Sequence, residues 1–388
     1  MPKVVVGMSG GVDSSVTAYL LKKQGYEVEG LSFYLWAPES LSGFTAHCSL
    51  PAMEEASDAA RHLGISHSVI DLRDEFTKKV VKPFIRGYAS GSTPNPCILC
   101  NRLIKFRFLL AQAEKIGAEY ISTGHYARVE KNQDAGFRMQ DSGDDMFFLK
   151  KGIDPKKDQS YVLYALGQRE LKKLILPLGH YRKDEVRKIA QELNLPAAKK
   201  PESQEICFVE DKSYFRFIEK LTHSAEKTGP IVDMNGRVIG KHKGIHEYTI
   251  GQRKRLGVSS TEPLYVIKID AIENTIYAGS SEAAKKKEFF VKDLNWINPH
   301  TSLLHSPRPL ARGGGECKND YKQPAIGGKF AFRASVKIRS MMKDEPATIT
   351  LSDKTVQVIF VEPQWAPAPG QSAVFYDGEI LMGGGVII

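Results

Sequence analysis

The chain has 388 residues, enough for two or three domains that each bury a hydrophobic core. Its 54 Lys and Arg outnumber its 45 Asp and Glu, and the net charge of +9 suits a polyanionic partner. No apolar run is long enough to cross a membrane, and the first strand begins too early to leave room for a signal peptide. We therefore expect a cytoplasmic protein whose five scattered cysteines serve chemistry or metal binding rather than a disulfide framework.

The stretch from Val4 to Ser15, VVVGMSGGVDSS, is predicted to be a strand, a glycine turn and the start of a helix. Such a turn presents backbone N–H groups and a positive helix end to a phosphate. It fits neither the Walker pattern nor the dinucleotide fingerprint. SGGVDSS instead resembles the pyrophosphate loop of the ATP pyrophosphatase superfamily. The alternative interpretation is an ordinary strand-to-helix turn that binds nothing. The resemblance implies ATP and Mg²⁺, with Asp13 near the metal and nucleotide contacts from Gly7, Met8, Ser9, Gly10, Gly11, Val12, Asp13 and Ser14, and a hydroxyl from Ser15.

Strands and helices alternate through the first half of the chain. Strands are predicted at 4–6, 27–34, 67–72 and 120–123, and helices at 16–23, 51–63, 74–88 and 103–116. This alternation indicates an α/β fold with a parallel sheet and a ligand at the carboxyl ends of its strands. Gly124 and His125, which follow a predicted strand, should therefore share an edge with the glycine turn. Phe33 is a candidate for stacking on adenine, although a core aromatic is the alternative.

The polar segment between residues 88 and 103 carries two cysteines behind a rigid Pro94-Asn95-Pro96 turn. Cys97 and Cys100 should stand at the start of a helix, where the helix terminus, Arg102 and Lys105 are expected to lower a thiol pKa. Such a pair is redox-active, metal-binding, or a nucleophile with a neighbour. A second C-x-x-C motif is absent from the sequence, so local motifs do not provide a four-cysteine zinc site.

The second half changes character. A helix is predicted at 182–195, followed by a loop that carries Cys207. From about residue 215, short strands and turn glycines replace the βα alternation, and the last hundred residues alternate like a barrel or sandwich. We expect a catalytic domain at 1–215, a small β-rich domain at 216–287 and a C-terminal β-barrel at 288–388, with a Gly- and Pro-rich flexible insertion at 306–329.

Several blocks along nearly the whole chain are similar to the tRNA-specific 2-thiouridylase family. They are STPNPCILCNRLIKF, STGHYARV, KDQSYVLY, QEICFV, HEYTIGQRKRLGV, Ile338-Arg339, and PGQSAVFYDGE with the glycines at 383–385. The resemblance implies ATP-dependent thiolation of the wobble uridine of tRNA. ATP adenylylates the C2 oxygen of the base, and sulfur then displaces AMP.

The family's residue roles are carried over position by position. Cys207 is expected to hold a persulfide and Cys100 to act as the second thiol, with a Cys100–Cys207 disulfide as the oxidised end state. Gly124 and Phe33 join the ATP contacts. Contacts with tRNA or its target base are implied for Asn95, Pro96, Cys97, His125, Lys157, Asp158, Gln159, Arg339, Ser340 and Gln371. A sulfur-donor protein is implied as a partner, and a monomer is expected.

Cys97 opens an alternative, because many relatives have Asp at this position. Cys97, Cys100 and Cys207 would supply three thiolates to an iron–sulfur cluster. A different class also stays open: another ATP pyrophosphatase, such as an amide-forming ligase, or a nucleotide-binding regulator. A ligase would not need the two thiols, and a binding module would not need an adenylylating loop.

Overall fold

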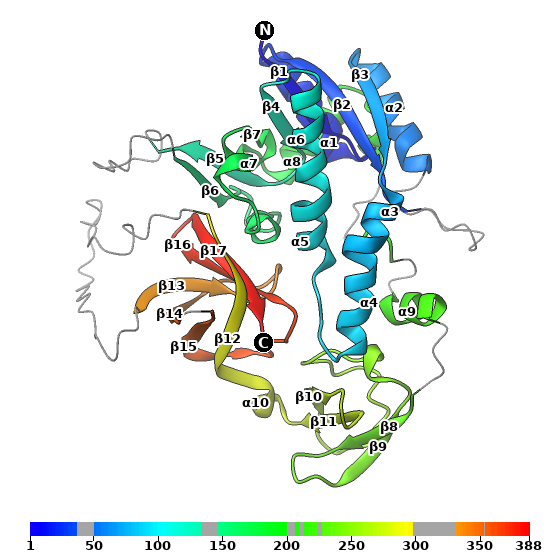
Figure 1. The fold of residues 1–388 in the computed structure, drawn as a ribbon, viewed down its shortest axis with the longest axis vertical. Helices are drawn as coiled ribbons and strands as arrows, with labels where there is room; N and C mark the ends of the chain where they lie inside the picture. Colours follow the sequence, from blue (N-terminus) through cyan, green and yellow to red (C-terminus); the bar gives the residue numbers. More distant parts are fainter. Residues whose placement is uncertain are drawn as a thin grey trace.

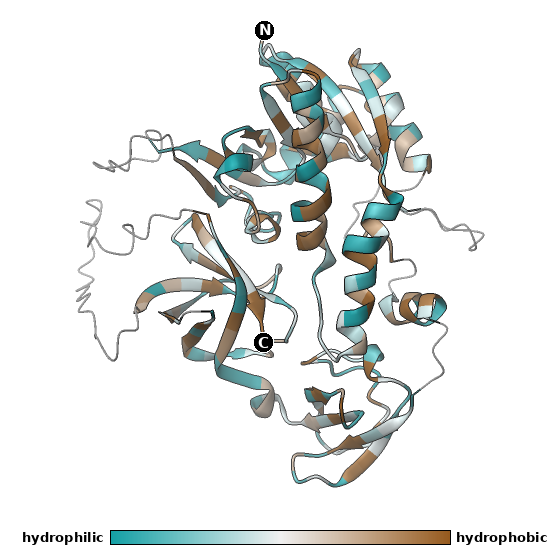
Figure 2. Cartoon of the chain, in the orientation of Figure 1, coloured by the Kyte–Doolittle hydropathy of each residue, from teal (hydrophilic) through white to brown (hydrophobic). Residues whose placement is uncertain are grey.

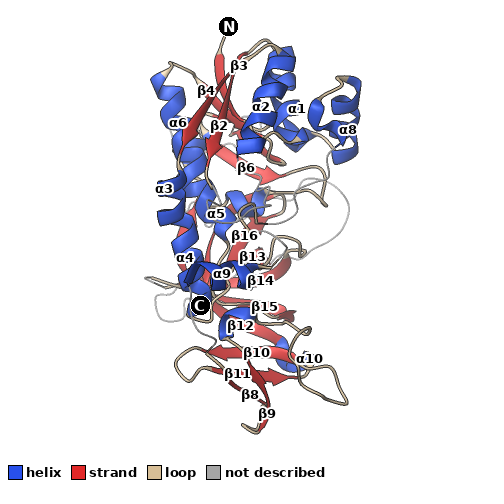
Figure 3. Ribbon diagram, turned by 90° about the vertical axis from the view of Figure 1, so that its right-hand side faces the viewer, coloured by secondary structure: helices blue, strands red, loops and turns tan. Residues whose placement is uncertain are grey.

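The computed structural model describes residues 1–36, 50–132, 146–199, 206–209, 213–222, 227–297, 331–352 and 354–388. Three sheets follow one another along the long axis of the molecule (Figures 1 and 3). The predicted insertion at 306–329, with Cys317, lies outside the described residues, as does Cys48. No helix in the described ranges combines the length and apolar character needed to span a membrane.

The first sheet is parallel and has the strand order β3-β2-β1-β4-β7. Its strands are β1 (Lys3–Gly7), β2 (Glu27–Tyr34), β3 (Ser66–Asp71), β4 (Tyr120–Thr123) and β7 (Leu174–Ile175). The chain moves from β1 to β2 on one side, whereas β4 lies on the other side of β1. This reversal is the switch point at which open α/β sheets bind ligands.

Helices cover both faces of this sheet. Val4 and Val6 pack with Ala18 and Leu21 on one face, while Val5 belongs to the larger core cluster on the other. Figure 2 shows these apolar strands between amphipathic helices. The helical segments up to residue 222 are α1 (Val12–Lys23), α2 (Leu50–Leu63), α3 (Arg73–Phe76), η1 (Thr77–Val81), α4 (Lys82–Ala89), α5 (Pro96–Cys100), η2 (Asn101–Lys105), α6 (Phe106–Lys115), η3 (Ser160–Leu163), α7 (Gln168–Leu171), η4 (Pro177–His180), α8 (Lys183–Glu192), η5 (Pro196–Lys199) and α9 (Tyr214–Thr222).

The small second sheet has the order β10-β11-β8-β9. Its elements are β8 (Gly229–Val232), β9 (Val238–His242), η6 (Ile245–Glu247), β10 (Tyr265–Asp270) and β11 (Thr275–Gly279). The short helix α10 (Ser281–Ala284) leads into the last sheet. The predicted boundaries at residues 215 and 287 stay predictions.

The C-terminal strands close into a six-stranded barrel, because β12 pairs with both β15 and β17. The barrel strands are β12 (Lys285–Trp296), β13 (Ala331–Lys337), β14 (Glu345–Leu351), β15 (Val356–Trp365), β16 (Ser372–Asp377) and β17 (Ile380–Ile387). The predicted fold class, a parallel-sheet domain followed by a small β-rich domain and a barrel, is confirmed.

One feature of the barrel sheet was not predicted. The hairpin of β5 (Ala127–Lys131) and β6 (Phe147–Lys151) extends that sheet. β6 pairs with β17 through Lys150 opposite Ile380 and Leu149 opposite Leu381. A segment of the first half of the chain is thus built into the sheet of the second half.

Candidate functional site

The glycine turn lies between β1 and α1 and is held by its own hydroxyls. Ser14 Oγ accepts a hydrogen bond from the Ser9 N–H at 3.1 Å and donates to the Gly11 carbonyl at 3.2 Å. Ser15 Oγ donates to the same carbonyl at 3.0 Å. Gly10 has φ +74°, a conformation that glycine adopts without strain. The turn is therefore fixed by hydrogen bonds between residues that are close together in the sequence.

The end of β4 closes over the start of α1. A Cβ on Gly124 would lie 2.9 Å from the Asp13 carbonyl carbon and the Ser14 nitrogen, so a larger residue would not fit. Gly124 and the glycine turn therefore meet at the switch point, as predicted. Asp13 itself is engaged: its Oδ1 accepts hydrogen bonds from Tyr126 Oη at 2.7 Å and Lys183 Nζ at 2.6 Å.

Lys183 is a site residue that the sequence analysis missed. It is the first residue of α8, where the helix dipole disfavours a cation, and only 9% of it is exposed. A lysine at that unfavourable position was the one available signal. Its ammonium reaches the glycine turn from an element 170 residues away. The Asp13 carboxylate thus has a fixed cation as its partner.

The floor of the turn is a buried polar chain. Ser32 Oγ donates to the Met8 carbonyl at 2.7 Å and lies 2.8 Å from His67 Nε2. Phe33, the next residue, is 8% exposed and belongs to the large core cluster. Phe33 therefore packs in the core, and its stacking on adenine stays a prediction.

The cysteine loop begins as expected, with Asn95 capping the helix. Asn95 Oδ1 accepts a hydrogen bond from the Cys97 N–H at 3.1 Å, and Pro96 occupies the first turn. The helical segments α5, η2 and α6 follow one another directly, with no residue between them. Asn101, next to Cys100, donates to the Val162 carbonyl at 3.0 Å and so ties this helix to the KDQSYVLY block.

Cys207 packs against the core cluster that contains Cys100, and Cys97 precedes Cys100 in α5. Burial raises the pKa of Cys100 to about 12, against a lowering effect of Lys105, and the charges of Cys207 and Cys97 raise it further. Desolvation and the charge of Cys207 raise the pKa of Cys97 to about 11. This holds although part of the Cys97 surface is accessible to solvent. The expectation that the helix terminus lowers these pKa values is wrong for this state, because desolvation outweighs the nearby cation.

Cys207 is placed by its neighbour. Phe208 is 1% exposed, with ring centroids 5.3–5.5 Å from Phe76, Phe84 and Phe217. Cys207 packs against the same core cluster that contains Cys100. Aromatic packing thus brings together two thiols that are 107 residues apart.

His125 follows β4 and packs against the first residue of α6. Its Nδ1 is 2.7 Å from Thr123 Oγ1, and its ring stacks on Phe106 with centroids 5.9 Å apart. Burial, helped by the charge of Lys105, lowers the pKa of His125 to about 3, so the imidazole is neutral at pH 7.

The predicted tRNA contacts in the first domain have internal partners. Asp158 accepts hydrogen bonds from the Gly152 and Ser160 N–H groups at 3.1 Å and lies 3.5 Å from Lys337 Nζ. Gln159 Oε1 accepts from the Tyr126 N–H at 3.0 Å. These bonds hold the hairpin and barrel together, and the tRNA roles of Lys157, Asp158 and Gln159 stay predictions.

The barrel residues also link domains. Arg339 donates to the carbonyls of Ile250 and Ala366 at 3.0 Å, and Ser340 is half-buried beside it. Gln371 donates to the Thr93 carbonyl at 2.8 Å, two residues before Asn95. The barrel therefore touches the loop that presents the thiols.

Three family models match the chain in succession. They are the tRNA methyl transferase HUP domain at residues 2–211, the tRNA methyl transferase PRC-barrel domain at 216–280 and the aminomethyltransferase beta-barrel domain at 286–387. The first alone covers more than half of the chain.

Relatives match over the full length. The tRNA-specific 2-thiouridylase MnmA of Clostridioides difficile strain 630 is 43% identical over 387 residues, covering 99% of this chain and 98% of that protein. The tRNA-specific 2-thiouridylase MnmA 1 of Caldanaerobacter subterraneus subsp. tengcongensis is 44% identical over 389 residues, covering 99% and 97%. A solved 4-thiouridine synthetase–RNA complex with bound ATP is 20% identical, with a TM-score of 0.36, over 56% of this chain and 50% of that one. Because these relatives match over nearly their full length, the chain belongs to the tRNA-specific 2-thiouridylase family.

Proposed function

We propose that this protein uses ATP to replace the C2 oxygen of the wobble uridine of tRNA with sulfur. The observation that carries the proposal is the packing of Cys207 against the core cluster that contains Cys100, in the domain that also bears the glycine turn. The names of the full-length relatives and the net charge of +9, which suits tRNA phosphates, support it.

The first step activates the base. The uridine C2 oxygen attacks the α-phosphorus of ATP, pyrophosphate leaves, and the N3 proton is lost to solvent. We expect the amides and hydroxyls of residues 9–15 and the Lys183 ammonium, which bonds to Asp13, to offset the charge of the leaving pyrophosphate. Neutral His125 offers hydrogen bonds near the base without adding charge. Its contact with tRNA is part of the proposal.

The second step delivers sulfur. Cys207 enters the cycle as a persulfide loaded by a sulfur-donor protein. The Cys100 thiolate attacks the Cys207 sulfur, forms a Cys100–Cys207 disulfide and releases hydrosulfide, which adds to C2 and expels AMP. A cellular thiol reductant then restores both cysteines. Because the pKa of Cys100 is near 12 in this state, tRNA and its activated base must first change the surroundings of the thiol.

The chain's residues fit the groups that this chemistry implies. Asp13 offers the single carboxylate typical of a site where Mg²⁺ arrives with ATP phosphates. Cys97, Cys100 and Cys207 would hold an iron–sulfur cluster, which would supply a labile sulfide. Cys97, in the same short helix as Cys100, would supply the third thiolate of this second candidate. We expect a monomer in the cytoplasm in either case.

Purified protein, ATP and unmodified tRNA test the proposal. Pyrophosphate release that requires tRNA, followed by 2-thiouridine in the nucleoside mass spectrum once a persulfide donor is added, is the expected result. A methylated nucleoside, or pyrophosphate release with a carboxylate and an amine in place of tRNA, would overturn it. Thiolation seen only after anaerobic reconstitution with iron and sulfide would select the cluster over the persulfide.

A further inference from the structure

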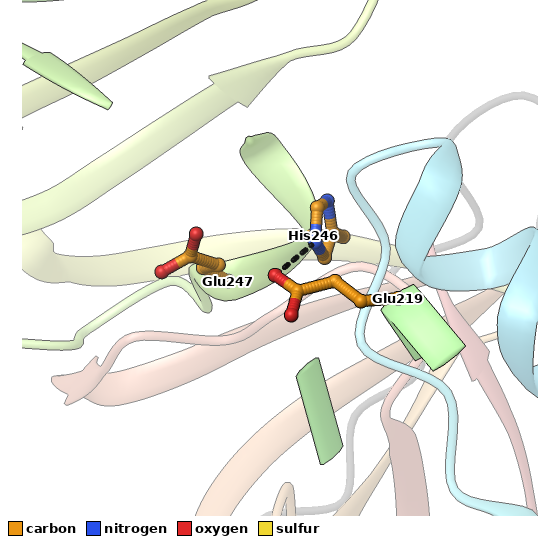
Figure 4. Close-up of side chains that lie close together, drawn as sticks. All are labelled: Glu219, His246 and Glu247. Atoms are coloured by element: carbon orange, nitrogen blue, oxygen red, sulfur yellow. Dashed lines mark hydrogen bonds and ion pairs between the residues drawn. The ribbon is translucent and has the colours of Figure 1, made fainter. Parts of the chain in front are cut away.

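A cluster of metal-ligating side chains lies at the junction of α9 and η6, outside the thiol site. Glu219 projects from α9, whereas His246 and Glu247 are in η6 of the small β-rich domain (Figure 4). All three are half-buried, and each pair of ligand atoms lies within 4.8 Å. Within the described residues this is the only such group of three.

The spacing suits a cation better than a hydrogen bond. His246 Nε2 is 3.4 Å from Glu219 Oε1, which is long for a charge-assisted hydrogen bond of about 2.7–2.9 Å. Two ligands on a tetrahedral ion with bonds of about 2.0–2.1 Å are about 3.4 Å apart. A carboxylate oxygen of Glu247 lies within 4.8 Å of both of these ligand atoms.

The surroundings hold the imidazole in place. A Cβ on Gly244 would lie 2.4 Å from His246 Cε1, so the ring packs directly on the backbone there. His242 is 1% exposed, its Nδ1 lacks a hydrogen-bond partner among the described residues, and burial, more than the nearby His246, lowers the pKa of His242.

We propose that Glu219, His246 and Glu247 bind one divalent first-row transition cation of the Zn²⁺ class. Two carboxylates balance its charge, and the imidazole nitrogen selects it over Mg²⁺ or Ca²⁺. The ion ties α9 to η6, beside the hydrogen bond from Tyr214 Oη to the Glu247 carbonyl at 3.1 Å. α9 follows the segment that carries Cys207, and its Tyr214 stacks on Tyr88 of α4 with centroids 4.5 Å apart. The cation thus steadies the element next to the thiol.

Titration of the full-length protein with Co²⁺, without nucleotide, tests this site. Co²⁺ held by nitrogen and oxygen gives visible ligand-field bands, whereas Co²⁺ on the cysteines adds sulfur-to-metal charge-transfer absorption. We expect one ion per chain with ligand-field bands alone at low occupancy, and a rise in the melting temperature. Glu219→Gln and His246→Gln should weaken this binding at least tenfold, while Glu262→Gln, an exposed residue of the same domain, should leave it unchanged.

Circular dichroism would reveal a folding defect in the Glu219 and His246 variants. Glu247→Gln keeps the His246–Glu219 pair, so it tests the site even if those variants misfold, and it should also weaken Co²⁺ binding. Three results would overturn the proposal: charge-transfer absorption from the first addition, equal affinity in wild type and Glu247→Gln, or no Co²⁺ binding together with a lower melting temperature of metal-free Glu219→Gln. The last outcome would make the pair a simple ion pair.

Discussion

The glycine turn and the thiol site belong to one domain but are built in opposite ways. The turn is a contiguous stretch fixed by hydrogen bonds among Ser9, Gly11, Ser14 and Ser15. The thiol site joins residues 97–100 to residue 207 through a buried aromatic cluster centred on Phe208. The turn is a local structure, whereas the thiol site depends on the packing of the domain.

This contrast separates function from stability. Changes at the turn should remove chemistry and leave the fold unchanged, because the turn supports little of the core. Changes beneath the thiols should lower both stability and thiolation, because the same packing serves both. Each prediction below tests one side of that contrast, in order of decreasing effect on activity.

Cys100→Ser and Cys207→Ser should each reduce tRNA thiolation below detection while tRNA-dependent pyrophosphate release continues. A serine hydroxyl neither carries sulfur nor ionises near pH 7. Nucleoside mass spectrometry and a pyrophosphate assay on the same samples give the two readouts. Cys317→Ser is the matched control and should keep full activity. Thiolation by Cys207→Ser would contradict the proposed sulfur carrier.

Lys183→Met should lower kcat/KM for pyrophosphate release by about 10²–10³-fold, the usual effect of losing one fixed electrostatic contact to a developing charge. Its melting temperature should stay near that of wild type. Lys188→Met lies on the same helix with 77% of its side chain exposed and is the control. Identical kinetics for the two variants would remove Lys183 from the site.

Phe208→Ala should reduce the free energy of unfolding by about 3–5 kcal/mol, because it empties a fully buried aromatic site. Thiolation should fall more than pyrophosphate release at a temperature where the variant is folded. Phe290→Ala, at a residue 44% exposed, is the control and should change stability little. Chemical denaturation with both activity assays measures this. An equal fall in both activities would show that Phe208 does not act through Cys207.

Lys105→Met should slow alkylation of Cys100 several-fold at pH 9. Lys105 lowers the pKa of Cys100, so its removal raises that pKa and leaves less thiolate at any pH below it. Iodoacetamide rates for the Cys100 peptide, followed from pH 7 to 11 by mass spectrometry, provide the profile. Lys105→Arg should restore the wild-type curve, and a profile unaffected by either change would refute the charge effect.

Gln371→Ala should have the smallest effect, a loss of about 1 kcal/mol from one hydrogen bond to the Thr93 carbonyl. We expect a few-fold increase in KM for tRNA because the cysteine loop loses its contact with the barrel. Gln364→Ala, whose amide bonds within its own strand, is the control. Steady-state kinetics with varied tRNA would show whether KM responds at all.

The local elements could be read from the sequence because their signals are local. The strand at 27–34 and the strand at 120–123 were predicted with the observed bounds, and the predicted helix at 51–63 is α2, one residue longer. The glycine turn, Gly124 and the Asn95 cap also lie where the pattern indicated. Each of these depends on backbone geometry within a few residues.

Features that depend on distant partners could not be predicted. The sequence around Lys183 does not indicate its contact with Asp13. Residues 127–151 likewise do not indicate the pairing with β17. The thiol pKa direction was wrong because the helix terminus and Lys105 are visible in the sequence, whereas the burial of Cys100 is not. Desolvation is a property of the packed domain.

The pairing of β6 with β17 has a consequence for synthesis on the ribosome. β17 begins at Ile380, more than two hundred residues after β6 ends, so it leaves the exit tunnel long after the β5–β6 hairpin. The hairpin must therefore wait with one edge unpaired until β17 has been made. A nascent chain stalled before residue 380 should expose that edge to chaperones, and the hairpin should gain amide protection only after β17 has emerged.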